Sequence, residues 1–207
     1  MTRRIFIERT LRQIYNGQPT NDASITDNLV NAWLSDGIGV AAKNSYKENY
    51  QLEGIGFVNN SFYSTFKGIV ITEDEYNLYK FNLPEIPVGI GANEGVRVIF
   101  KNANNELSFP AVMLTQNQVG IQRQMRTIPN KIYCYTEGGF GYAVTYLQMN
   151  NYTATVTMIS GGDSTNLDSQ LNVPPDFLPI IVEYIKAQLG FERAQKQDVS
   201  NDGATTV

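Results

Sequence analysis

The C-terminal part of the chain constrains the fold most, because it predicts a helix that is too short and too apolar on one face to be stable alone. Pro174, Pro175 and Asp176 predict an extended entry with an N-cap at Asp176. The apolar residues that follow at helical spacing are Phe177, Ile180, Ile181, Tyr184, Ile185, Leu189 and Phe191. Since isolated short helices are marginal in water, we expect this helix to pack on the rest of the protein or on a partner.

The residues after Phe191 form a polar tail. Gly190 predicts that the helix ends close to Phe191. Residues 192–203 have too little apolar area to offset an ordering cost of about 1–2 kcal/mol per residue. We therefore expect the tail to be mobile alone and to gain order by docking on a partner. The residues predicted to make this interface are Phe191, Arg193, Lys196 and Val199.

The first part of the chain has the periodicity of helices. Residues 3–15 predict an amphipathic helix with its arginines opposite the apolar stripe. A second helix is predicted from Ser24, which resembles the start of a capping box, to about residue 50. Gly37 and Gly39 lie inside this second helix, and each costs about 1 kcal/mol relative to alanine, so we expect a break or kink there.

The middle of the chain has the pattern of strands. After Ile55, short runs rich in aromatic and β-branched residues alternate with turn signals. Hairpin turns are predicted at residues 101–105 and 137–140, and residues 152–159 alternate most regularly. Helices, then strands, then one helix predict an α+β fold with an inserted antiparallel β module of meander or sandwich type.

These boundaries divide one structural unit into four parts. Residues 1–53 form the N-terminal helical part, and residues 54–160 form the antiparallel β module. Residues 161–173, which are rich in Gly, Ser, Asp and Asn, are interpreted as a linker. Residues 174–207 form the C-terminal helix and its docking tail.

The residues needed for common catalytic sites are missing. The chain has no histidine, which removes the usual general base and the usual metal ligand, and its single cysteine, Cys134, lies in a predicted strand. The glycine-rich residues 89–95 fit neither a dinucleotide fingerprint nor a P-loop. We expect no catalytic residue, no metal and no cofactor. An enzyme that uses two paired carboxylates stays open, because pairing in space cannot be read from the sequence.

The charges are few and unevenly placed. The net charge is −4 and 17% of the residues are charged, which disfavours uniform binding along nucleic acid. Residues 114–129 are basic, rich in glutamine and too long for a tight turn. They predict either a solvated surface loop or a protruding loop that contacts a neighbouring subunit, a second protein or DNA, through Gln122, Arg123 and Arg126. No apolar run approaches the roughly 18 residues of a membrane span, so we expect a protein that stays in the cytosol or in a particle assembled there.

The order of these parts resembles that of head-to-tail connector proteins of tailed bacteriophages, the adaptor or ring proteins of the neck. The residues that carry the resemblance are 22–42, 82–87, 173–189 and 198–203. The weakly charged, asparagine-rich composition is similar to that of the crAss-like phage group. The resemblance implies a structural virion protein that forms a homo-oligomeric ring, typically of twelve subunits, below the portal protein. Such a ring joins the capsid to further ring or tail proteins, and DNA passes through its lumen without sequence-specific binding.

A different class of function is also compatible with the sequence. The chain contains 12 tyrosines and 10 phenylalanines, many of them in the predicted strands. Exposed aromatic rings on strands could form a platform for ligands. The alternative is therefore a β-rich carbohydrate- or protein-binding module of a phage tail or of a bacterial surface assembly.

Overall fold

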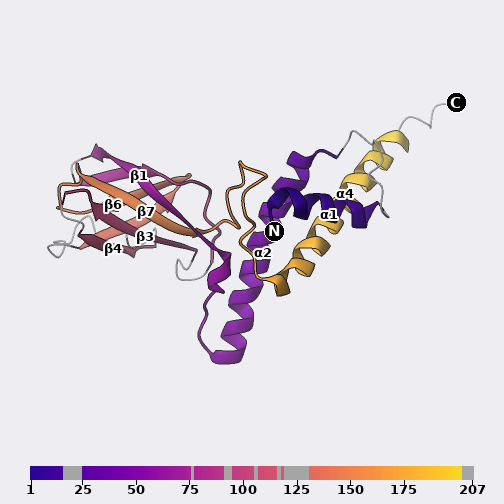
Figure 1. The fold of residues 1–207 in the computed structure, drawn as a ribbon, viewed down its shortest axis with the longest axis horizontal. Coiled ribbons are helices and arrows are strands. Elements are labelled where there is room, and N and C mark those ends of the chain that lie inside the picture. The colour runs from indigo at the N-terminus through magenta and orange to yellow at the C-terminus, as the bar shows by residue number, and fades with distance from the viewer. Residues whose placement is uncertain are drawn as a thin grey trace. The chain divides into compact units, whose positions relative to one another are not determined.

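The chain folds into two compact units, one helical and one made of strands. The computed structural model describes residues 1–15, 25–75, 77–90, 95–104, 107–115, 118 and 131–201, with side chains as far as Phe191 in the last helix. The helical unit comprises Met1–Phe62 together with Gly161–Val207, and the β unit comprises Tyr63–Ser160 (Figure 1). The fold is α+β, as the sequence predicts.

The two N-terminal helices begin at threonine caps. Helix α1 (Arg3–Ile14) starts at Thr2, whose hydroxyl accepts a hydrogen bond from the backbone N–H of Ile5. Helix α2 (Asp27–Glu53) starts at Thr26, whose hydroxyl accepts in the same way from Leu29. Each hydroxyl satisfies a donor that has no partner within its own helix. The cap of α2 thus lies two residues after Ser24, the cap that the sequence predicted, and Ser24 itself is outside the described residues.

Helix α2 is continuous through Gly37 and Gly39, so the predicted break was wrong. The reason is the packing of α2 against helix α4 (Leu178–Asn201). A Cβ atom at Gly37 would lie 3.1 Å from Cγ2 of Ile181 and 3.3 Å from Cδ1 of Tyr184. Gly37 thus lets the two helices approach closely, and the contact offsets the low helix propensity of glycine.

Helix α4 differs at both ends from the prediction. It follows a 3₁₀ turn, η3 (Pro175–Phe177), whose cap is Pro174 without a side-chain hydrogen bond, so Asp176 is not the N-cap. The helix also continues past Gly190 to Asn201 instead of ending near Phe191. Residues 192–196 are mostly strong helix formers, which offset one glycine. The most buried side chains of α4 are Ile181, Ile185 and Leu189.

The strands of the β unit close into a barrel. Within the described residues they are β1 (Tyr63–Glu75), β2 (Leu78–Asn82), β3 (Val96–Asn102), β4 (Ser108–Met113), β5 (Ile132–Glu137), β6 (Phe140–Val144) and β7 (Tyr152–Ile159). Their order around the barrel is β1-β2-β6-β5-β4-β3-β7. The predicted β3–β4 and β5–β6 hairpins are confirmed, and closure replaces the predicted sandwich. A closed barrel leaves no open strand edge.

One pair of neighbouring strands in the barrel is parallel. Strands β4 and β5 pair in parallel, whereas the other pairs described here are antiparallel. Parallel neighbours cannot be joined by a hairpin and need a long crossover connection. This requirement explains why the glutamine-rich segment after Met113 is long. Gln122, Arg123 and Arg126 of that segment lie outside the described residues.

The barrel interior is apolar and contains the single cysteine. Alternate residues of β3 and β7 point inward, among them Val98, Phe100 and Val156. Cys134 is fully buried with them, and burial raises the pKa of its thiol. Its neighbours Tyr133 and Tyr135 belong to a second, separate apolar cluster, so both faces of β5 are covered.

The packing at Gly37 can be tested by comparing it with Gly190, a glycine of α4 whose surroundings are open. Gly37→Val should lower the free energy of unfolding of the helical unit by about 1–3 kcal/mol, because the new methyl groups overpack the contact with α4. Gly190→Ala, at a helical position with nothing within 4 Å of the new Cβ, should raise it by up to about 1 kcal/mol. Trp33, the single tryptophan, is buried in α2, so its fluorescence during urea unfolding follows this unit. Equal stabilities of the two variants would contradict the close approach.

Candidate binding groove of the helical unit

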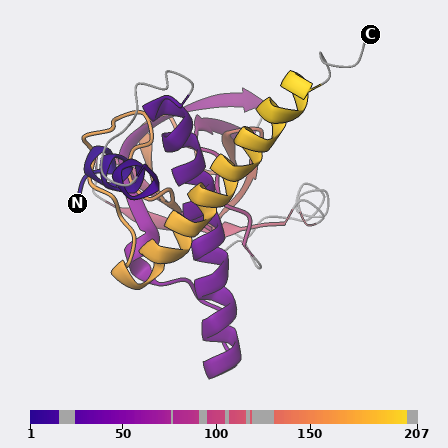
Figure 2. The same cartoon turned by 90° about the vertical axis from the view of Figure 1, so that its right-hand side faces the viewer.

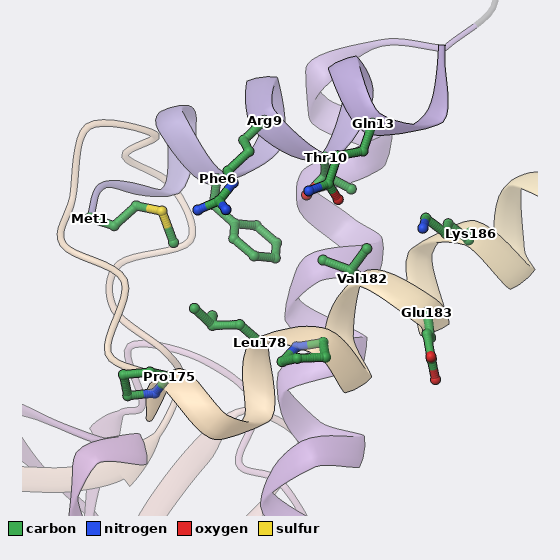
Figure 3. A pocket seen from close by; sticks show the side chains of 11 residues that line it. Met1, Phe6, Arg9, Thr10, Gln13, Pro175, Leu178, Val182, Glu183 and Lys186 are labelled. Atoms are coloured by element: carbon green, nitrogen blue, oxygen red, sulfur yellow. The ribbon is translucent and has the colours of Figure 1, made fainter. Parts of the chain in front are cut away.

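A groove lies between α1 and the beginning of α4. Its volume is about 400 Å³ (Figure 3). The residues that line it are Met1, Phe6, Arg9, Thr10, Gln13, Pro175, Leu178, Pro179, Val182, Glu183 and Lys186. All of them belong to the helical unit, so the groove is formed within one compact body.

The groove has an apolar floor and a charged rim. The ring of Phe6 projects from α1 into the space towards Leu178 and Val182 of α4 (Figure 3). Phe6 is buried, and the two α4 residues are half-buried. Arg9 and Lys186 are exposed at the rim (Figure 3). A surface of this kind suits apolar side chains that carry or adjoin a charged group.

The position of α1, and with it one wall of the groove, depends on the buried side chain of Arg3. Its Nε donates to Oδ1 of Asn31 at 3.0 Å, and its Nη2 donates to Oγ of Ser35 at 2.6 Å. Its Nη1 donates to the backbone carbonyl of Gly161 at 3.5 Å. A buried guanidinium must satisfy its donors to offset the loss of water. The prediction that the arginines of α1 face away from its packed side is wrong for Arg3, which is fully buried.

The backbone of α1 is also bound to the return segment, residues 161–172, which brings the chain back from the β unit. The N–H of Arg3 donates to the carbonyl of Ser169 at 3.1 Å, and the N–H of Arg4 donates to that of Leu167 at 2.7 Å. The first N–H groups of a helix have no partner within the helix, and the return segment supplies one. The segment that the sequence analysis treated as a linker therefore packs as part of the helical unit.

Ionised carboxylates strengthen the return segment. Asp168 accepts a hydrogen bond from Nε of Arg4 at 2.7 Å, which lowers the pKa of Asp168. The pKa of Asp163 is lowered mainly by hydrogen bonds from Thr165 and to a smaller degree by the charge of Arg3. Since both folded pKa values lie below the ordinary value near 3.8, the stabilisation is present above that pH and is lost as the pH falls through the folded pKa values. Both groups are exposed, so each contribution is small.

The rim charges of the groove are available to a ligand. The ion pair between Arg4 and Asp168 lies outside the groove lining. Arg9, Glu183 and Lys186 of the rim have no ion-pair partner within the described part of the chain. The groove contains one carboxylate and no cysteine, and no group of three metal-ligating side chains occurs anywhere in the described residues.

Of the sequence-predicted interface residues, Phe191 is the one whose side chain is described. Phe191 is on α4 with 67% of its surface exposed, but it is not among the lining residues. Arg193, Lys196 and Val199 lie on the helical backbone of α4, and their side chains are outside the described residues. The groove residues Phe6 and Thr10 are four residues apart and so share one helix face, which is a sequence signal for this wall of the groove.

A second cluster of aromatic side chains lies on the β unit. The rings of Tyr135 and Tyr142 are stacked, with centroids 5.0 Å apart and planes 11° apart. Nζ of Lys80 lies 3.9 Å from the ring centroid of Phe140 and 5.7 Å from that of Tyr142. These contacts cover ring faces with neighbouring side chains. The cluster therefore resembles a structural cross-strand ladder more than an open platform.

Comparison of the chain with protein-family models and with curated proteins finds no match. Among the described residues, no helix combines the length and the apolar character needed to cross a membrane. The assignment of a function therefore depends on the groove and its surroundings.

The role of Arg3 can be tested against a second arginine on the same helix. Arg3→Ala should lower the free energy of unfolding of the helical unit by about 1–3 kcal/mol, because it leaves the half-buried acceptors of Asn31 and Ser35 and the buried carbonyl of Gly161 without their donor. Arg12→Ala, at an exposed position of α1, should change it by less than about 0.5 kcal/mol. Urea unfolding followed by Trp33 fluorescence measures both. If the two variants lose the same stability, Arg3 does not hold α1 in place.

Proposed function

We propose that this chain is a structural subunit of a phage neck, a head-to-tail connector that assembles with copies of itself into a ring below the portal protein. The observation that carries the proposal is the open groove between α1 and α4. Its apolar floor and its rim charges, which have no ion-pair partner among the described residues, are suited to binding another protein. The order of parts along the chain resembles that of connector proteins, and this resemblance is the reason for proposing a ring. In such a ring, DNA passes through the lumen and further tail proteins attach to the free face.

The end of α4 supports a role in docking. The last turns of α4 extend beyond α1 and α2 within the helical unit (Figures 1 and 2). Leu189 is buried, whereas Phe191, two residues later, is largely exposed. A projecting helix that carries an exposed aromatic residue can bind in a groove of a partner. We assign this end of α4 to attachment to the portal.

A non-catalytic role fits the available side chains. The sequence has no histidine, and its one thiol is buried in the barrel with a raised pKa, which disfavours the reactive thiolate. The groove offers one carboxylate, Glu183, so it does not provide the paired acids that the remaining enzymatic alternative needs.

The carbohydrate-binding alternative has weaker support. A sugar stacks on the free face of an aromatic ring, and such faces must be open to solvent. In the described cluster, Tyr142 is stacked on Tyr135, and Lys80 covers Phe140. The cluster is thus already used for contacts within the β unit.

The proposal predicts self-assembly that is visible as a ring. The purified chain, alone or mixed with the portal protein of the same phage, should form particles whose mass is a multiple of the protomer mass. Class-averaged electron micrographs should show a closed ring with a central channel. A protein that stays monomeric over the accessible concentration range and in the presence of the portal is not a ring connector.

If the end of α4 docks on the portal, its removal should weaken attachment without unfolding the protein. Deletion of residues 192–207 should leave Trp33 fluorescence and urea unfolding nearly unchanged, because Leu189, the last buried residue described in α4, remains. Attachment to the portal, measured by co-sedimentation, should weaken at least about tenfold, which corresponds to about 1.4 kcal/mol. The matched control is Lys43→Ala, at an exposed position of α2. Undiminished attachment of the truncated protein would place the portal contact elsewhere, for example on the first helices.

A further inference from the structure

The C-terminal end of α2 and the residues that follow it expose several large apolar side chains. We call residues 50–57 the α2 tip. Leu52 and Ile55 are 83% and 67% exposed, and Tyr50 and Phe57 are also exposed. Glu53 is the one charged residue in this stretch. Large apolar side chains gathered on a surface in this way mark an interaction site.

The α2 tip is built as a firm projection. Gly54 ends the helix in the left-handed conformation with φ of 71°, and its N–H donates to the carbonyl of Tyr50 at 3.0 Å. The side-chain amide of Asn49 donates to the carbonyl of Phe57 at 2.8 Å, which closes the turn. Gly56 lies directly against the ring of Tyr46. A surface held by its own hydrogen bonds loses little freedom when it binds.

The tip lies too far from the groove of its own copy to occupy it. Arg3 fixes α1 beside Ser35 of α2, and Leu52 follows Ser35 by about 25 Å along a helix that rises about 1.5 Å per residue. Figure 2 shows the end of α2 projecting away from α1 within the helical unit. Any contact between the tip and the groove must therefore join two copies of the chain.

The tip and the groove are complementary in charge and in apolar character. The tip carries exposed Leu52 and Ile55 beside Glu53, and no basic residue lies in the last turn of α2, where the helix dipole is negative. The groove has an apolar floor, and its rim carries Arg9 and Lys186 without ion-pair partners in the described part of the chain. Two cations against Glu183 leave the rim net positive.

We propose that the α2 tip of one copy occupies the α1–α4 groove of the next. This inference rests on the proposed self-assembly and names its contact. Because two different surfaces of the same chain meet, the contact is heterologous and repeats around a ring when its rotation closes. Both surfaces belong to the helical unit, so the contact does not involve the barrel.

The test is thiol cross-linking between two differently substituted proteins. Leu52→Cys places a thiol on the tip, and Val182→Cys places one in the groove. The native thiol of Cys134 is fully buried and does not compete. One protein carries an additional tag, so that a mixed dimer is distinguished from dimers of either protein after treatment with a short bis-maleimide. The matched control replaces the tip variant by Val70→Cys, an exposed position of β1 (72%) in the β unit.

The mixed L52C and V182C sample should give at least about ten times more mixed dimer than the V70C and V182C control. In parallel, Leu52→Lys should raise the concentration needed for self-assembly at least about tenfold, because it removes an apolar contact and adds a cation against a net-positive rim, whereas Val70→Lys should not. Trp33 fluorescence confirms that both variants are folded. Particle mass is measured on the same samples. Rings that form without the mixed cross-link, or a cross-link of V182C with itself, overturn the tip-in-groove contact and leave the proposed function standing. Absence of any oligomer overturns both.

Discussion

The helical unit depends on one buried cation. Arg3 hydrogen-bonds to Asn31 and Ser35 of α2 and to the carbonyl of Gly161, the first residue of the return segment. It therefore joins the two ends of a unit that the β module interrupts in sequence. An apolar side chain could fill the same space, but it would not fix direction, because dispersion contacts allow many orientations and a planar guanidinium does not. The angle of α1, and hence the width of the groove, follows from this network.

Sequence patterns predicted the parts of the fold that depend on neighbours in the chain. The alternation in residues 152–159 predicted β7, and turn residues predicted the β5–β6 hairpin, because period and turn chemistry are local properties. The same reasoning failed at Gly37, where the local cost of glycine is outweighed by the approach of Ile181 from α4. It failed at Arg3 for a similar reason, since its acceptors lie far away in sequence.

The groove could not be predicted for the same physical reason. Its walls come from residues near both ends of the chain, and their meeting depends on the return segment, which composition alone presents as a linker. The sequence did contain a partial signal, because Phe6 and Thr10 are four residues apart on α1. That signal identifies a buried face without saying what covers it. The element that packs on α1 is α2, and the opposite wall of the groove is α4, which begins more than a hundred residues later.

The closure of the barrel affects how copies of the chain can associate. An open sheet exposes unpaired backbone groups at its edges, and these readily pair with the edge of a second copy. Here β1 pairs with both β2 and β7, and the order of strands returns on itself, so this route is absent among the described strands. Association through side chains remains, and side-chain surfaces can be made complementary and directional. In the helical unit, the α2 tip is apolar and carries a carboxylate, and the groove is apolar and carries cations without an ion-pair partner among the described residues, so the two provide such a pair of surfaces. The β module has no open strand edge, and the helical unit has two different surfaces, the tip and the groove, that can bind each other. This combination favours ordered, directional assembly over edge-to-edge aggregation.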